Sequence, residues 1–422
     1  MSLRDKMLAV MADVNASVAE REELVELIAI ALLTRKNLFI LGDPGQAKSY
    51  AINAFRSRIT GAKQFERLLS KQTDEEQLFG RLDLSSLIPG SVPEAAFEGD
   101  GIYQNLRFDL QSFLNGLPKM KNETATFEKL AEISGKLDAY RKAVAALHPC
   151  EPVVQTAGKL PEADIVFLDE IFKCNDGVLN ALLTALNERK YTNEGRTYPI
   201  PTISFFAASN EIPNFNNPEE KILSALYDRL ELKVVTENIS EKSHRLAILK
   251  DKLGGSFGAV YATISLEELR AMQQEVTAIQ VPDSIHDLMD DVLCALRAQI
   301  PVSDRKFLSY FSIAQAKAWL EGHTEVTSTD LLVLRNYFWQ QPGDREFVTG
   351  TLERLCVNPM QEKVSDLLAM AQDAKDGFDN ACGAAENVRT KQAALRKFRG
   401  ELVRLYQMQT EMAANAGSDS ER

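Results

Sequence analysis

The stretch NLFILGDPGQAKSY, residues 37–50, decides the fold class of the chain. Residues 37–41 form a short apolar run typical of a buried strand, and YAINAFRSRI after Ser49 has the apolar spacing of a helix. The octapeptide GDPGQAKS therefore joins a strand to a helix, which is where a phosphate-binding loop is found. In such a loop, backbone N–H groups converge on the anion and the helix N-terminus adds positive potential.

Each residue type in the loop has a chemical reason to be there. Gly42, Pro44 and Gly45 favour the tight turn, Lys48 is placed to contact the β- and γ-phosphates, and the Ser49 hydroxyl to complete a Mg²⁺ shell. Ala47 occupies a position where the usual pattern has glycine. The loop alone therefore leaves two readings open, a nucleotide site and a plain tight turn with an exposed lysine.

Two further apolar runs end in polar side chains. ADIVFLDE, residues 163–170, ends in Asp169 and Glu170, and TISFFAASN, residues 202–210, ends in Asn210. At the end of a buried strand, an aspartate can hold Mg²⁺, a glutamate can polarise an attacking water, and an amide can hold that water or the γ-phosphate. The structural alternatives are an acidic helix N-terminus for the pair and an Asx turn for Asn210.

The continuous apolar runs predict an α/β domain with a parallel sheet covered by helices on both faces. We place this domain at residues 1–236, with an insertion at about 91–152, a helical lid at 237–345 and a helical extension with a frayed tail at 346–422. Within these domains the sequence predicts a helix capped by Asn175 or Asp176, a hairpin over Lys190 to Pro201, and a helix in FEKLAEISGKLDAYRKAVAALH. Further helices are predicted to start at Ser265, at Pro282 and at Ser328 or Thr329, and a long helical pattern over 359–413 to be interrupted near Gly377 and Gly383.

The composition narrows the function classes. A formal net charge of −12 opposes unassisted binding to nucleic-acid phosphates, and the longest apolar run of the N-terminal region, Leu27 to Leu33, is too short to span a membrane. Five scattered cysteines without a Cys-x-x-Cys pair indicate a reducing, cytoplasmic setting, and four dispersed histidines give no metal site beyond nucleotide-bound Mg²⁺.

Together, GDPGQAKS, LLSKQTDEEQLFGRLDLSSL, GKLPEADIVFLDEIFKCNDGVLNALLTALNERKYTNEGRTYPIP, FFAASNEIP and ALYDRLEL resemble the MoxR family of AAA+ ATPases, closest to its RavA subgroup. The resemblance spans roughly residues 18–340, and alanine before the lysine is the usual form of the loop in that family. It implies that Lys48 and Ser49 belong to Walker A, Asp169 and Glu170 to Walker B and Asn210 to sensor 1. It also implies that Arg229 is an arginine finger and Arg305 a sensor 2 residue; their structural alternatives are a surface ion pair and a helix-start residue.

The resemblance implies catalysis by Glu170, Asn210, Arg229 and Lys48, with ATP and Mg²⁺ as cofactors. The residues expected to contact the nucleotide are Gly42, Asp43, Pro44, Gly45, Gln46, Ala47, Lys48, Ser49, Tyr50, Asp169 and Arg305, and those expected at the Mg²⁺ are Ser49 and Asp169.

An arginine finger acts on the nucleotide of a neighbouring subunit, so the resemblance also implies a homo-oligomeric ring, with a hexamer as the family expectation. The expected activity is ATP-driven, chaperone-like remodelling of a protein client, with a von Willebrand A domain protein as the common partner. The insert in LLSKQTDEEQLFGRLDLSSL and the hairpin in ERKYTNEGRTYPIP correspond to family elements that point toward the pore or a partner. About 60 residues near 91–152 depart from the family, and the small β-domain of the RavA subgroup is missing from the last 80 residues.

Two other classes of function, and one neighbour within the same class, stay open at this point. A nucleic-acid motor shares the inserts, but the hairpin carries Glu188 and Glu194 beside Lys190 and Arg196. A magnesium chelatase subunit is a neighbour within the same class of ATPases. A catalytically silent AAA+ scaffold is the last alternative, and the filled catalytic positions of this chain argue against it.

Overall fold

The computed structural model describes residues 2–83, 97, 99–116, 123–147, 154–193, 196–215, 217, 220–254, 262–357, 359–383 and 388–419. Its contacts divide the chain into two units. One unit consists of Ala9–Leu266, and the other of Met1–Leu8 with Glu267–Arg422.

A five-stranded parallel sheet forms the centre of the Ala9–Leu266 unit, with the strand order β10-β1-β9-β6-β3. Its strands are β1 (Leu38–Leu41), β3 (Gln64–Leu68), β6 (Ile165–Asp169), β9 (Ser204–Ser209) and β10 (Leu232–Val235). The register places Leu41 beside Ser209, and Asp169 beside Ala208. The carboxyl ends of β1, β9 and β6 therefore meet at one edge, and the predicted α/β fold with a parallel sheet is confirmed.

Helices cover this sheet because its strands are apolar on both faces; all six residues of β9 are buried. Phe39 of β1 lies 5.4 Å from Phe172 and 5.5 Å from Tyr227, measured between ring centroids, within one continuous core. The other elements of this unit around the sheet are α1 (Leu3–Ser17), which begins in the other unit, α2 (Glu22–Thr34), α3 (Lys48–Arg56), β2 (Ile59–Thr60), α4 (Glu75–Phe79), η4 (Leu160–Glu162), η5 (Ile171–Lys173), α7 (Asp176–Glu188), β7 (Lys190–Asn193), β8 (Arg196–Pro199), α8 (Lys221–Tyr227), α9 (Lys242–Gly254) and β11 (Ile264–Ser265).

Several local predictions hold in this unit. The Asn175 side chain caps α7 by accepting from Val178 N at 3.0 Å, and β7 pairs with β8 as the predicted antiparallel hairpin, whose turn at 194–195 lies outside the described residues. The expectation of helices alone after residue 237 is wrong in one detail. Strand β11 pairs in parallel with β2 because its chain returns to the sheet unit before the helical unit begins.

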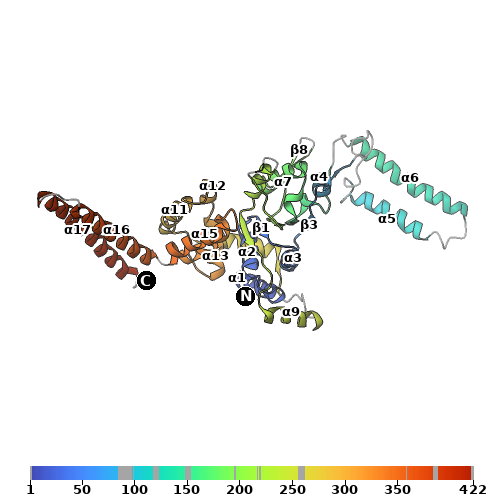
Figure 1. The fold of residues 1–422 in the computed structure, drawn as a ribbon. Coiled ribbons are helices and arrows are strands. Elements are labelled where there is room, and N and C mark those ends of the chain that lie inside the picture. The colour runs from blue at the N-terminus through green and yellow to red at the C-terminus, as the bar shows by residue number, and fades with distance from the viewer. Residues whose placement is uncertain are drawn as a thin grey trace. The chain divides into compact units, whose positions relative to one another are not determined.

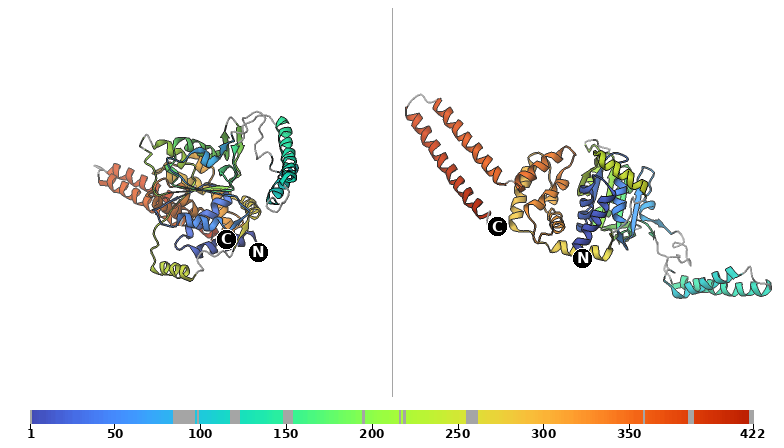
Figure 2. Two further views of the ribbon diagram at one scale, coloured as in Figure 1. Left: turned by 90° about the vertical axis from the view of Figure 1, so that its right-hand side faces the viewer. Right: turned by 90° about the horizontal axis from the view of Figure 1, so that it is seen from below.

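The predicted insertion lies between β4 (Arg81–Leu82) and β5 (Val154–Gln155), which form an antiparallel pair. Its helices α5 (Gly101–Gly116) and α6 (Glu123–Leu147) run side by side (Figure 2). They share a small core of their own, in which the rings of Phe97 and Tyr103 stack at 4.1 Å. The helix predicted in FEKLAEISGKLDAYRKAVAALH is thus confirmed as part of α6 over residues 127–147, and its last residue, His148, lies outside the described residues.

The second unit is helical. Its elements are α10 (Leu266–Ala278), α11 (Asp283–Arg297), α12 (Asp304–Phe307), α13 (Phe311–Glu321), η6 (Ser328–Leu334), α14 (Arg335–Phe338), α15 (Asp344–Leu352), η7 (Glu353–Val357), α16 (Pro359–Gly383) and α17 (Val388–Asp419). The starts predicted at Ser265 and Pro282 are confirmed for α10 and α11. The start predicted at Ser328 or Thr329 is wrong by one residue or more, because Thr327 forms a reciprocal cap with Asp330 and opens a 3-10 helix.

Helices α16 and α17 form an antiparallel hairpin, in which the rings of Phe378 and Phe398 stack at 4.7 Å (Figure 1). The predicted interruption near Gly377 is wrong, since α16 continues through it to Gly383. Helix α17 extends to Asp419, so that the last three residues of the tail predicted to fray lie outside the described residues. Among the described residues, none of the helices combines the length and apolarity that crossing a membrane requires.

Candidate nucleotide site

The loop between β1 and α3 stands at the edge where the carboxyl ends of the strands meet. Gly42 N donates to Ser209 O at 3.1 Å, which ties the start of the loop to the end of β9. A Cβ added at Gly42 would lie 2.1 Å from Thr236 Oγ1 and 3.0 Å from the Thr236 carbonyl oxygen. Only glycine fits there, and the loop is held close to the end of β10.

Two loop residues adopt left-handed backbone conformations, Gly45 with φ +87° and Ala47 with φ +59°. Glycine reaches this region without a steric penalty, whereas alanine is strained there. Ala47 is therefore an alanine at a position that favours glycine. The left-handed backbone conformation explains why the usual motif has glycine there. Asp43, Pro44, Gly45 and Ala47 are exposed, as a ligand would require.

The Lys48 side chain is buried, with 7% of its surface exposed, and it is directed toward the end of β9. Its Nζ donates to Asn210 Oδ1 at 2.6 Å, to Ser209 O at 3.4 Å and to the carbonyl oxygen of Gly42. Burial lowers the pKa of Lys48, and the nearby carboxylates of Asp169, Glu170 and Asp43 oppose this effect. The ammonium is thus held at the loop by oxygen acceptors from two strand ends.

Asp169 and Glu170 follow β6 at the same edge. Ser49 Oγ, in the first turn of α3, lies 3.5 Å from Asp169 Oδ2. A hydroxyl and a carboxylate are the hard oxygen ligands that Mg²⁺ prefers, so these residues fit the metal implied by the sequence. Tyr50, the next residue of α3, is half-buried beside them in the chain.

Glu170 has a left-handed backbone conformation, with φ +55°, which turns its side chain away from the strand direction. Asn210 Nδ2 donates to Glu170 Oε1 at 2.6 Å, and Lys173 Nζ lies 3.2 Å from Glu170 Oε2. The carboxylate is thus fixed by an amide on one side and by a cation on the other. Such an arrangement can hold a carboxylate in position to accept a proton from water.

The structure therefore brings together Lys48, Ser49, Asp169, Glu170 and Asn210. It places Arg229 elsewhere in the same unit. The Arg229 carbonyl accepts from Asn37 Nδ2 at 2.8 Å, and Asn37 stands at the amino end of β1, opposite to the phosphate loop. Its guanidinium donates to Ala225 O of its own chain. Arg305 is exposed in the short helix α12 of the helical unit.

Two contributions to the site were missed from the sequence. Lys173 stands three residues after Glu170, a spacing that could have been recognised as an ion pair. Arg21, buried at the start of α2, donates to Gln46 O of the loop at 3.2 Å and to the Glu237 carbonyl after β10. Its neighbour Glu20 accepts from the backbone N–H groups of Ser240 and Glu241 before α9. No local sequence pattern predicts these contacts, since Arg21 and Gln46 are 25 residues apart and Glu20 and Ser240 are 220 residues apart.

A parallel sheet of this order, with a phosphate loop after one strand and an acidic pair after another, is the architecture of a P-loop nucleotide-binding domain. Comparison with known families agrees. Residues 5–99 and 123–274 match the model of the MoxR domain in the MoxR-vWA-beta-propeller ternary systems, and residues 280–352 match an AAA lid domain. The chain belongs to the MoxR family of AAA+ ATPases.

Relatives extend over most of the chain. Two uncharacterised proteins of Methanocaldococcus jannaschii, MJ0079 and MJ0812, are each 29% identical to it, over 88% and 79% of the chain and over 80% and 71% of their own lengths. Structural protein ORF618 of Acidianus two-tailed virus is 22% identical over 79% of the chain and 49% of its own length. A solved structure of a putative ATPase from Cytophaga hutchinsonii shares the fold, with a TM-score of 0.56, 14% identity and coverage of 83% of this chain and 94% of that one.

Proposed function

We propose that the protein hydrolyses ATP with Mg²⁺ at this site and uses the reaction to remodel or activate a protein partner. The observation that carries the proposal is the connected set Lys48, Asn210 and Glu170, in which one amide bridges the loop lysine and the carboxylate. Lys48 is in position to bind the β- and γ-phosphates, and Ser49 and Asp169 to hold the metal. Bound Mg²⁺ would neutralise charge on the phosphates.

In this proposal Glu170 orients and deprotonates the attacking water, and Asn210 places both the carboxylate and the γ-phosphate. Lys173 restrains the second carboxylate oxygen. The exposed backbone from Asp43 to Ala47 is available to the phosphates at the N-terminus of the nine-residue helix α3. These contacts supply positioning and electrostatic stabilisation, which carry most of the catalysis in phosphoryl transfer.

Arg229 supports a site shared between subunits. Because Arg229 stands at the amino end of β1, it is not available to the phosphate loop of its own chain. We propose that it acts on the nucleotide of a neighbouring copy, within a ring for which a hexamer is the family expectation. Arg305 is proposed to contact the nucleotide from the helical unit.

The partner proposal rests on two surface elements and on the family description. Helix α4 and the β7–β8 hairpin are joined by Phe79 and Tyr191, whose rings stack at 4.7 Å. They therefore form one unit that a bound partner could displace together. The matched family model names MoxR-vWA systems, and a von Willebrand A domain protein is accordingly the partner that we propose.

The hairpin does not favour a nucleic-acid motor. Lys190 Nζ lies 3.6 Å from Glu188 Oε2, and the sequence sets Glu194 against Arg196, so the hairpin has little net charge to attract phosphates.

The experiment that tests the proposal is Glu170→Gln. This change keeps the side chain's size and its Asn210 contact but removes the proton acceptor, so turnover should fall by about 10²-fold or more while ATP binding persists. Steady-state phosphate release and calorimetric ATP titration measure the two quantities. Glu132→Gln, the same exchange at an exposed carboxylate of α6 outside the site, serves as the control and should leave turnover unchanged. Undiminished hydrolysis by Glu170→Gln would remove the assignment.

A further inference from the structure

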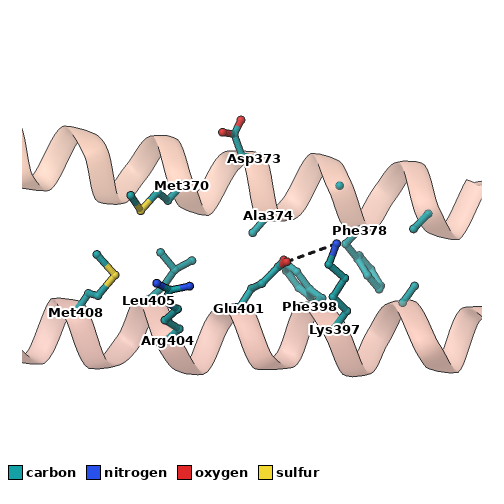
Figure 3. Close-up of a pocket in the computed structure, with 13 residues that line it drawn as sticks. Met370, Asp373, Ala374, Phe378, Lys397, Phe398, Glu401, Arg404, Leu405 and Met408 are labelled. Carbon is teal, nitrogen blue, oxygen red and sulfur yellow. Dashed lines mark ion pairs between the residues drawn. The ribbon is translucent and has the colours of Figure 1, made fainter.

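The α16–α17 hairpin carries an apolar surface that its two helices do not bury. A groove of about 450 Å³ runs between them (Figure 3). Its apolar lining includes Met370, Phe378, Phe398, Leu405 and Met408, and the charged side chains of Asp373, Lys397, Glu401 and Arg404 also line it. Small residues such as Ala374 and Ala394 line the same groove and leave it open.

The exposed apolar surface continues beyond the groove on α17. Leu395, Leu402 and Tyr406 are 58%, 45% and 71% exposed and share one side of the helix, at spacings of seven and four residues. They border Phe398 and Leu405 of the groove, so that a single broad apolar arc covers this side of α17. An arc of this width is typical of a helix with more than one helical neighbour.

The charges of the two helices are opposite. In the part of α16 whose side chains are described, residues 367–383, there are three acidic residues and one basic residue. Residues 389–410 of α17 contain six basic residues and one acidic residue, although the whole chain has a formal net charge of −12.

The described acidic side chains of α16 and basic side chains of α17 do not form ion pairs with one another. Among the hairpin's described side chains, the ion pair joins Lys397 to Glu401 at 3.9 Å, within α17 itself. Asp373, Asp376 and Asp379 of α16, and Arg396, Arg399 and Arg404 of α17, are exposed. The acidic side of α16 and the basic side of α17 thus stay exposed in the hairpin, with Asp373 and Arg404 also at its groove.

We propose that the hairpins of two copies of this chain pair into a four-helix bundle, with α16 of each copy beside α17 of the other. In this arrangement the helices alternate in charge around the bundle, and every helix has two oppositely charged neighbours. The apolar arcs of both hairpins meet in the bundle core, which the two-helix hairpin alone cannot close. The interface is isologous, because the same surface is used by both copies.

Charge reversal tests this pairing in the full chain. One variant carries Arg396→Glu, Arg399→Glu and Arg404→Glu, and the other Asp373→Lys, Asp376→Lys and Asp379→Lys. Each variant alone has two helices of like charge and should lose the association made through the hairpin, whereas a mixture of the two variants restores opposite charges across this interface. Sedimentation in nucleotide-free buffer and co-purification of tagged with untagged chains measure association.

The expected result is co-purification of the unlike variants at least about tenfold above that of either variant with itself, a difference of 1.4 kcal/mol. Lys129→Glu, Lys136→Glu and Lys142→Glu on α6 form the control matched to the arginine variant, with the same change in net charge, and should associate as the unaltered chain does. Far-UV circular dichroism checks that the helices persist in each variant.

Equal co-purification of all pairs would overturn the proposal, because ring contacts elsewhere do not depend on these charges. So would a mixture that stays dissociated while both variants keep their helices, since restoring opposite charges would then not restore the pairing.

Discussion

Asn210 joins the phosphate-loop lysine to the acidic strand end, since its amide donates to Glu170 Oε1 at 2.6 Å and its Oδ1 accepts from Lys48 Nζ at the same distance. One side chain thereby sets the positions of a cation and a carboxylate that belong to different strands. ATP that draws Lys48 toward its phosphates would remove one of these two bonds, and Asn210 would be freed to turn.

Asn210→Ala should therefore lower turnover more than affinity. Loss of one positioned amide in a catalytic site costs about 10²–10³-fold in kcat, whereas the loop contacts to the phosphates stay in place. Steady-state kinetics with a parallel ATP titration separates the two effects. A variant with normal kcat would show that the amide has no part in the reaction.

Ala47→Gly should bind ATP as the unaltered chain does. Glycine relieves the strain at φ +59°, roughly 1 kcal/mol, but adds a similar entropic cost in the unfolded chain, so the stability should change by less than about 1 kcal/mol. Lys48→Ala should instead abolish binding. Calorimetric titration and thermal unfolding measure both variants, and normal ATP binding by Lys48→Ala would contradict our account of the loop.

Gly42→Ala should displace the first residues of the phosphate loop, because the added methyl group collides with Thr236. The added methyl meets the backbone oxygen of Thr236 at 3.0 Å as well as two side chains, and overpacking of this kind costs about 1–3 kcal/mol. We expect ATP affinity to fall about tenfold or more. Gly343→Ala, where nothing lies within 4 Å of the new methyl, is the control. Equal behaviour of the two variants would show that the loop tolerates displacement from Thr236.

Arg229→Ala and Lys48→Ala should complement each other. An arginine finger contributes about 10³–10⁵-fold to turnover, so each variant alone should be inactive. In mixed assemblies, a subunit with an intact loop can meet a neighbour with an intact Arg229, and activity should reappear. Co-expression of the two tagged chains, followed by ATPase assays, measures it; persistent inactivity of verified mixed oligomers would place Arg229 in its own subunit's site.

Glu20 predicts a pH dependence of stability. Hydrogen bonds from the backbone of Ser240 and Glu241, together with His244, lower its pKa from 4.5 to about 2. The stabilisation is complete above pH 4.5, where the unfolded carboxyl is also ionised, and is lost as the pH falls toward 2. Urea unfolding of the unaltered chain and of Glu20→Gln should show a difference at pH 7 that shrinks below pH 4.5. A constant difference would contradict these contacts.

The sequence predicts the sheet and the main site residues because the signals are local. Asp169, Glu170 and Asn210 come at the end of apolar runs, and Lys48 ends the loop that follows another such run. Parallel strands bring their carboxyl ends to one edge. The left-handed conformations of Ala47 and Glu170 depend on how the loops close, which no residue type encodes. Arg21 and Glu20 act across about 220 residues of chain, so their roles emerge only once the sheet is folded.

The start of η6 is also not predicted correctly from the sequence, which favours Ser328 or Thr329 over Thr327 as the capping residue. Thr327 and Asp330 are correctly spaced for a reciprocal cap, but Ser328 and Thr329 offer competing hydroxyls. The apolar run DLLVL fits both a 3-10 helix and an α-helix over so few residues. Packing around Leu331 and Leu334, which are fully buried, decides between them.

The short β4–β5 ladder marks the place at which the α5–α6 insertion joins the rest of its unit. Because Arg81 pairs with Gln155 and Leu82 with Val154, the chain leaves and re-enters the ATPase core at adjacent points. The entropy of closing a loop grows only slowly with its length, by about 0.6 kcal/mol for each doubling. The family model itself passes over residues 100–122. Because both ends of the insertion meet at this ladder, its length and sequence can change while the strands that carry the nucleotide site keep their register.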